Sequence, residues 1–138
     1  MSIRLGAMTA FDLTPEHARQ VLAGSTAEPQ LVRRSLLLLT GAAEYKLIGI
    51  CAETVDEAVQ ALRGYLIFFG YPEPSLDFAS FDQPGVYLKF NPMTGTCYVS
   101  PYEGHERGVI VSCFSPQGGA TNDTYAHLPL DLFDEQLH

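Results

Sequence analysis

The chain has little charge for its length. Charged residues make up 17% of its 138 residues, whereas about 25% is usual for a soluble domain. Sixteen acids and eight bases give a formal net charge of −8, and Arg33 and Arg34 are the only adjacent bases. Binding to a phosphate backbone depends on clustered Lys and Arg. The composition therefore argues against nucleic acid and anionic membranes as partners, and it favours a protein partner or self-association.

Long hydrophobic runs and paired cysteines are also missing. Apolar runs such as Leu36 to Leu39 are far too short to span a bilayer, and Met1 to Phe11 has no secretory-type apolar core. The three cysteines, Cys51, Cys97 and Cys113, are an odd number without CxxC spacing, unlike disulfide scaffolds and zinc clusters. We therefore expect a cytoplasmic protein that needs no metal, cofactor or disulfide.

What is present is typical of one folded domain over residues 1–138. The chain has a normal domain length, and its 46% apolar residues exclude a disordered protein. Capping residues, prolines at first helical positions and terminal glycines mark three helices. The most distinct begins with a capping box made by Thr54 and Glu57. The expected helices are Thr14 to Gly24, Glu28 to Thr40 and Thr54 to Phe69.

Short β-branched and aromatic segments predict strands. Tyr45 to Ala52 is apolar on both faces, as in a central strand, and its Gly49 permits close approach of another group. The loop Tyr71 to Gly85 precedes the other strands, and the apolar tail ends with a short helix near Asp131 to Gln136. The other expected strands are Val86 to Asn91, Thr96 to Tyr102 and Arg107 to Phe114.

The order α-α-β-α-β-β-β predicts an α+β fold. We expect a four-stranded, mostly antiparallel sheet with helices on one face. The segment from Val86 to Phe114 is expected to be a three-stranded antiparallel meander. The strand Tyr45 to Ala52 could pair in either direction.

Turn lengths predict the register of this meander. A four-residue loop from Pro92 to Gly95 places Phe90 opposite Cys97 and Leu88 opposite Val99. Because neighbouring positions alternate between the two faces of a sheet, this register also fixes which side chains share a face.

A second turn near Gly104 and His105 continues the meander. It would place Cys97 near Cys113 and Val99 near Val111. Alternation then predicts one uniformly apolar core face beneath the helices. That face contains Leu88, Phe90, Cys97, Val99, Val109, Val111 and Cys113.

The opposite face mixes aromatic, hydroxyl and basic side chains. Tyrosine combines an apolar body with a polar tip, and binding surfaces are enriched in it. Two alternatives are that cross-strand pairs simply stabilise a solvent-facing sheet, or that the tail covers the face. The residues on this candidate binding face are Tyr87, Lys89, Tyr98, Ser100, Ile110, Ser112 and Phe114, with Tyr102 at its edge.

A small enzyme or small-molecule-binding protein is the rival hypothesis. Its site would lie between the meander turns and the tail. His105 could act as a general base near neutral pH, although a turn histidine among charges is more often solvated. The site would contain His105, Glu106, Arg107, Tyr125 and His127.

Metal binding is the third and weakest alternative. His127 and Asp131 lie four residues apart, but Pro129 between them argues against a helix that would set their spacing. No phosphate-binding loop, nucleophile elbow or HExxH motif is present. The sequence therefore assigns no catalytic and no metal-binding residue.

Three stretches of the chain resemble one family. They read YLKFNPMTGTCYVSPYEGHERGVIVSCFSP (Tyr87 to Pro116), NDTYAHLPLDLF (Asn122 to Phe133) and EYKLIGICAETVDEAVQALRGYLIFFGY (Glu44 to Tyr71). The family is one of uncharacterised, mainly cyanobacterial proteins, known as a domain of unknown function. The resemblance implies an intracellular protein without established activity and provides no site residues. Our leading hypothesis is a non-catalytic binding or protein-interaction module.

Overall fold

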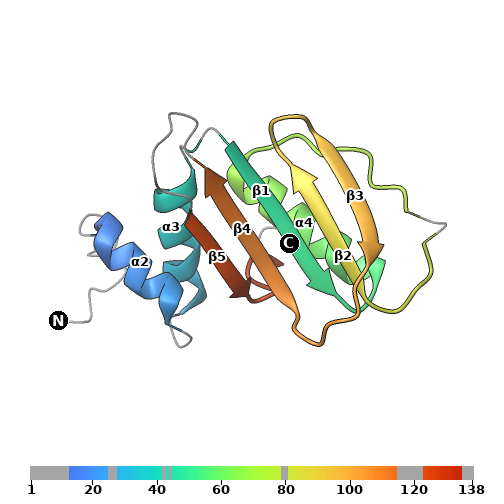
Figure 1. The fold of residues 1–138 in the computed structure, drawn as a ribbon. Helices are drawn as coiled ribbons and strands as arrows, with labels where there is room; N and C mark the ends of the chain where they lie inside the picture. The colour runs from blue at the N-terminus through green and yellow to red at the C-terminus, as the bar shows by residue number, and fades with distance from the viewer. Residues whose placement is uncertain are drawn as a thin grey trace. The chain divides into compact units, whose positions relative to one another are not determined.

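The chain divides into two compact units, Met1–Ala43 and Glu44–His138. The computed structural model describes residues 13–24, 28–41, 43, 45–78, 81–114 and 123–134. Within these residues the first unit contains helices, and the second contains a sheet and a helix (Figure 1). The single domain expected over residues 1–138 stays a prediction.

The first unit contains α2 (Pro15–Ala23) and α3 (Pro29–Thr40), which pack against each other. Each begins with proline, whose fixed φ suits the first turn. The side chains of Thr14 and Glu28 accept hydrogen bonds from first-turn amides at 3.1 and 2.8 Å. Both predicted helices are confirmed. Their N-terminal caps involve only neighbouring residues in the chain, so the sequence alone could indicate them.

The second unit is built on a five-stranded antiparallel sheet (Figure 1). The spatial order is β3-β2-β1-β4-β5, with β1 at the centre. The helix α4 joins β1 to β2. The elements are β1 (Tyr45–Ala52), α4 (Val55–Phe69), β2 (Val86–Asn91), β3 (Thr96–Pro101), β4 (Gly108–Phe114) and β5 (Asp123–Leu128).

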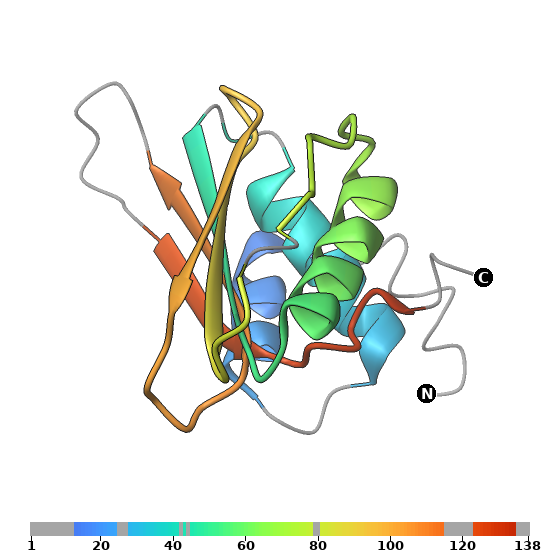
Figure 2. The same cartoon turned by 90° about the vertical axis from the view of Figure 1, so that its right-hand side faces the viewer.

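The predicted capping box opens α4. The Glu57 N–H donates to Thr54 Oγ1 at 3.1 Å, and the Glu53 N–H donates to Glu57 Oε1 at 3.0 Å. Gly70 ends the helix with a φ of 77°, which glycine adopts without steric cost. Figure 2 shows α4 against one face of the sheet, where it packs on β1 and β2.

The core lies between α4 and this covered face. The covered-face side chains of β2 and β4 alternate with less buried ones, as a half-buried antiparallel sheet requires, whereas the central strand β1 is buried at every position from Ile48 to Ala52. Of the predicted core face, Leu88, Phe90, Val109, Val111 and Cys113 are buried. Cys97 and Val99, on the outer strand β3, are half-buried.

The predicted three-stranded meander is wrong. The β2–β3 hairpin forms, with Phe90 opposite Cys97 and Leu88 opposite Val99 as expected. β3 and β4 do not pair, because β1 lies between β2 and β4 and is antiparallel to both. Two strands, β2 and β1, therefore separate Cys97 and Val99 from the neighbours predicted for them across a second turn.

The physical reason lies in residues 102–107, which form a crossover instead of a hairpin turn. This segment passes the ends of β2 and β1 before β4 begins. Its start is held by a hydrogen bond from the Tyr102 N–H to the Gly85 carbonyl at 3.1 Å. Its end is held by an ion pair between Arg107 and Glu53. Gly85 immediately precedes β2, and Glu53 immediately follows β1. These are the two strands that the crossover passes.

The prediction of four strands is also wrong, because the tail adds β5 at the edge beside β4. β5 contains a bulge opposite β4, where His127 has a φ of 63°. The bulge interrupts the alternation by which strands are recognised. Residues 130–133 form turns and Asp134 lies in a 3₁₀ turn. The last two residues of the short helix expected near Asp131 to Gln136 lie outside the described ones, so that helix stays a prediction.

Candidate functional site

The face of the sheet opposite α4 is the candidate site, and we call it the open face. Paired residues share a face, so the register assigns its members. Tyr98 is 63% exposed, and Tyr45 and Phe114 are each 38% exposed. The open face comprises Tyr45, Leu47, Gly49, Cys51, Tyr87, Lys89, Asn91, Thr96, Tyr98, Ser100, Gly108, Ile110, Ser112, Phe114 and Thr124.

The charge of the open face differs from that of the chain. None of its residues is acidic, although the chain has sixteen Asp and Glu, and Lys89 is its one charged residue. Hydroxyl, amide and aromatic groups supply the remaining polarity. Such a face can approach another protein without bringing carboxylates into the contact.

Tyr87 lies across β1 because Gly49 leaves room for it. A Cβ atom at Gly49 would lie 2.6 Å from Tyr87 Oη and 2.9 Å from Tyr87 Cε1. The close approach expected at Gly49 is therefore made by a side chain of the neighbouring strand. Burial, and secondarily the nearby Cys51, raises the pKa of the Tyr87 hydroxyl.

Lys89 and Tyr98 are neighbours across the β2–β3 hairpin. They border a hollow of about 310 Å³ on the open face, at the turn end of the hairpin. The hollow is shallow but combines an ammonium group, hydroxyl groups and an aromatic ring. Its lining residues are Leu47, Lys89, Asn91, Thr94, Thr96 and Tyr98.

The three cysteines are held as neutral thiols. Burial raises the pKa of the Cys97 thiol to about 11. Burial also raises the pKa of the Cys51 thiol, and this effect outweighs a hydrogen bond from Tyr102 that lowers the pKa. The pKa of Cys113 is raised by burial too, although Lys46 opposes the shift. Since the thiolate is the nucleophile, none of the three is set up for covalent chemistry.

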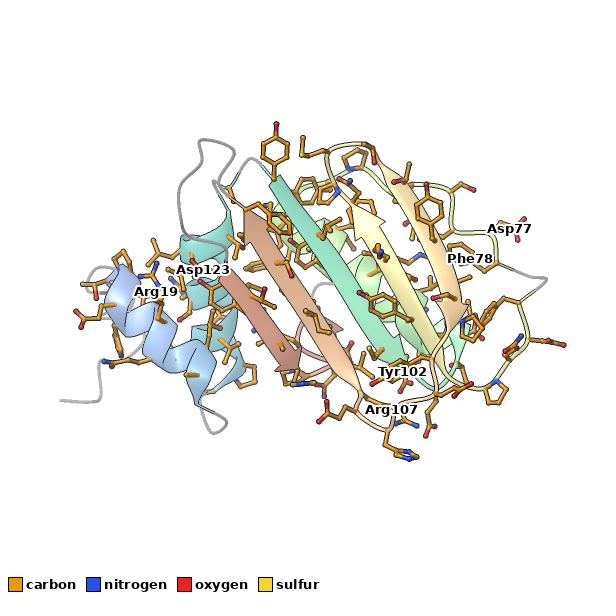
Figure 3. The ribbon with its side chains drawn as sticks, viewed as in Figure 1. Arg19, Asp77, Phe78, Tyr102, Arg107 and Asp123 are labelled. Atoms are coloured by element: carbon orange, nitrogen blue, oxygen red, sulfur yellow. The ribbon has the colours of Figure 1, made fainter. Side chains whose placement is uncertain are left out.

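The crossover brings some of the predicted rival-site residues together. Glu106 Oε1 lies 3.1 Å from His127 Nε2. Arg107 turns to Glu53 and donates to the His105 carbonyl at 2.8 Å. Figure 3, which looks onto the open face, shows Arg107 and Tyr102 at the same end of the sheet.

Tyr125 does not join that group. It pairs with Val111 and so lies on the opposite face, where its hydroxyl is buried. Within the described ranges, no three His, Cys, Asp or Glu side chains are placed to hold a metal ion. The structure thus places Glu106 beside His127. The described residues contain no set of ligands that would support the metal hypothesis.

A larger cavity of about 880 Å³ lies at the N-terminal end of α4, and sequence analysis missed it. Part of its lining comes from the loop Tyr71 to Gly85 that follows α4. Of the predicted site residues only Arg107 lines the cavity, together with its ion-pair partner Glu53. Its lining combines carboxylates, arginines and phenylalanines: Asp56, Arg63, Asp77, Phe78, Phe81 and Asp82.

Lys46 is buried on the covered face, which sequence analysis also missed. Its side chain is only 3% exposed, and Nζ lies 5.1 Å from the ring centroids of both Phe69 and Tyr71. Within the described residues Nζ has no hydrogen-bond partner, and neither has the hydroxyl of Tyr65. Cation–π contacts replace hydration here, and burial raises the pKa of Tyr65.

Comparison with known proteins places the chain in a family. A crystal structure at 2.11 Å of an uncharacterised protein from Anabaena variabilis ATCC 29413 is similar to it, with 39% sequence identity and a TM-score of 0.75. The match covers 87% of this chain and 98% of that one. None of the curated proteins matches the chain.

The helices described in the structure include none long and apolar enough to cross a membrane. Residues 15–133 match the family described as Domain of unknown function (DUF1824). With its relative from Anabaena, the chain belongs to this uncharacterised cyanobacterial family.

Proposed function

We propose that the protein is a non-catalytic, cytoplasmic interaction module that binds a protein partner through the open face. The observation that carries the proposal is the chemistry of that face. It presents exposed aromatic rings and hydroxyl groups and no carboxylate, on a chain with a net charge of −8. Protein-binding surfaces are depleted in acids and enriched in aromatic residues in this way.

The state of the reactive groups supports a non-catalytic role. Burial keeps the thiols of Cys51 and Cys97 protonated at neutral pH. The Glu106–His127 pair is exposed at the end of the sheet, where water would screen it. Catalytic groups usually sit in enclosed sites with strongly perturbed pKa values.

The test compares an open-face variant with a matched surface variant. Tyr45 and Phe114 pair across β1 and β4 and are equally exposed, so Tyr45→Ser with Phe114→Ser removes one contiguous aromatic patch. Ile67→Ser, on α4 and 54% exposed, is the control. Tagged proteins would be used to capture partners from the native cells, followed by binding measurements with the purified partner.

We expect the double variant to bind the partner at least tenfold more weakly, since a few large aromatic side chains often contribute most of the binding energy in protein interfaces. Ile67→Ser should bind like the wild type. Equal binding by all three proteins would remove the open face from the proposal.

Small-molecule binding in the cavity at the end of α4 is a second candidate function. Its volume of about 880 Å³ lies within the range of known ligand pockets, roughly 300–1,000 Å³. Thermal-shift screening against small metabolites would test it, because a ligand that binds only the folded state raises Tm. Gln83→Trp, at the cavity, should abolish the Tm increase. Gln60→Trp, outside the cavity, should keep it, and this pair of results would support the function.

A further inference from the structure

β3 forms one edge of the sheet, with β2 on one side and none of the described strands on the other. Its six residues, Thr96 to Pro101, contain no charge. Its register with β2 is continuous, without a bulge. Natural proteins usually protect edge strands with charges, bulges or a covering segment, because unpaired strand edges pair with other chains.

The direction of each β3 backbone group follows from one hydrogen bond. The Tyr102 N–H donates to the Gly85 carbonyl, just before β2, at 3.1 Å. Because successive residues alternate in direction, Tyr98 and Ser100 also direct their backbone groups toward β2. Cys97 and Val99 therefore direct both N–H and C=O away from the sheet.

None of the described strands pairs with these outward groups. None of the described backbone hydrogen bonds outside the helices and strands reaches Cys97 or Val99. Figure 2 shows the described parts of the chain between α4 and β2 on the α4 side of the sheet. The edge therefore offers two N–H and two C=O groups, bounded by Pro101, which has no N–H.

We propose that β3 pairs antiparallel with β3 of a second copy, about a two-fold axis at Tyr98, and joins the two sheets. This inference rests on the proposed interaction role and names the partner as the same chain. Cys97 of each copy pairs with Val99 of the other, and each pair exchanges both N–H···O=C bonds. The charge-free edge lets two chains of net charge −8 meet without opposing carboxylates.

The outward groups select this register over its alternatives. It uses all four outward groups of Cys97 and Val99 on each copy. Centring the pairing on Val99 would place Cys97 opposite Pro101, which cannot donate. Centring it on Tyr98 also places the two Tyr98 side chains directly opposite each other on the open face, in a non-hydrogen-bonded pair where side chains approach most closely.

A proline substitution tests the pairing without removing a β2–β3 hydrogen bond. Val99→Pro deletes an outward N–H and leaves the inward groups of Tyr98 and Ser100 in place. Val99→Ala loses a comparable amount of side-chain packing and keeps the N–H, so it is the matched control. Light scattering over roughly 10 μM to 1 mM covers the affinities expected for a small interface.

We expect the wild type and Val99→Ala to approach twice the monomer mass, and Val99→Pro to remain a monomer with the same circular dichroism spectrum. A wild type that stays monomeric throughout overturns the proposal, as does a Val99→Pro variant that associates like Val99→Ala. If the wild type is monomeric and a different protein binds Val99→Ala but not Val99→Pro, the edge serves that protein and self-pairing is overturned.

Cysteine crosslinking tests the register. Tyr98→Cys should form an intermolecular disulfide under mild oxidation, because the two positions oppose each other at a suitable Cβ separation. Thr96→Cys should not, since Thr96 faces Ser100 of the other copy; Thr96→Cys mixed with Ser100→Cys should crosslink. The wild type, with its own cysteines, is the control.

Crosslinking of Thr96→Cys alone as fast as Tyr98→Cys would overturn the register. Failure of self-pairing would not affect the open-face proposal, because Tyr45 and Phe114 lie on β1 and β4, outside β3. Conversely, the Tyr45→Ser/Phe114→Ser variant could lose partner capture while its light-scattering mass stays that of the wild type. That outcome would support the open-face proposal independently of self-pairing through β3.

Discussion

The two edge strands of the sheet differ in charge and in regularity. β5 begins with Asp123, contains a bulge and has His127 in a left-handed conformation with a φ of 63°. β3 is charge-free, regular and continuous in register. Bulges twist an edge away and charges oppose pairing. If β3 pairs with a second copy as proposed, β5 ends the sheet and β3 extends it.

The connections to the two edges also differ. β3 is joined to β2 by the local turn Pro92–Gly95, in which Gly95 has a φ of 74°. β5 meets β4 at Gly108, where a Cβ atom would lie 2.8 Å from the Leu128 carbonyl oxygen and 3.0 Å from His127 Cα. One edge therefore depends on a turn conformation, and the other depends on close backbone contact.

The largest expected effect is at the β5 edge. Gly108→Ala should lower the free energy of unfolding by about 2 kcal/mol, because the new methyl group meets backbone atoms that cannot move aside. Gly95→Ala, at a positive φ with nothing within 4 Å, is the control and should cost about 1 kcal/mol. Urea denaturation measures both. An equal or smaller loss for Gly108→Ala would contradict the close contact at β5.

Amide hydrogen exchange should separate the edges next. At low protein concentration the amides of Tyr98 and Ser100 should be protected by β2, and those of Cys97 and Val99 should exchange fast. When the concentration rises well above the dimer Kd, protection of Cys97 and Val99 should increase about tenfold. The outward amides of β5 should not change with concentration. Protection that rises equally at both edges would remove the distinction between them.

A smaller effect is expected at high pH on β3. The pKa of Cys97 is raised by burial to about 11, from 9.0 for a free thiol. The unfolded chain therefore loses this proton first, and the stability contributed by the neutral thiol decreases from about pH 9 to pH 11.

Cys97→Ala should remove that component, which is of order 1 kcal/mol for a half-buried group. The difference in unfolding free energy between wild type and variant, measured at several pH values, isolates Cys97 from the tyrosines and lysines that titrate in the same range. A difference that is constant from about pH 8 to pH 11 would show that the thiol is solvated.

Sequence patterns predicted what is local in this fold. The capping residues fixed the ends of the helices, and the turn from Pro92 to Gly95 fixed the β2–β3 register. The sequence also predicted correctly which face of the sheet each β4 residue lies on, although it predicted the wrong neighbouring strand for β4. Alternation depends on the strand itself, so Val109 and Val111 face the core whether β1 or β3 lies beside them.

The non-local features could not be predicted in this way. Residues 102–107 are long enough for either a hairpin loop or a crossover, and the position of β1 between β2 and β4 depends on pairing between segments about 40 residues or more apart. The bulge at His127 concealed β5. The cavity was missed because its lining comes from α4, the following loop and the crossover, whose meeting is a tertiary feature.

The smallest expected effect concerns the ion pair that accompanies the β5 bulge. Glu106 and His127 are 72% and 55% exposed, so Glu106→Gln should change the free energy of unfolding by less than about 0.5 kcal/mol. Glu103→Gln, exposed in the same crossover, is the control, and the difference between the two variants should vanish in about 1 M salt.

The same variant asks which feature protects β5. If the backbone bulge ends the sheet there, Glu106→Gln should have the light-scattering mass of the wild type at every concentration, since the bulge persists without the ion pair. New, larger assemblies in Glu106→Gln would show that charge protects β5. The difference between β5 and β3 would then depend on charged side chains and not on the backbone. In that case, adding a carboxylate to β3 would be enough to prevent its pairing with a second copy.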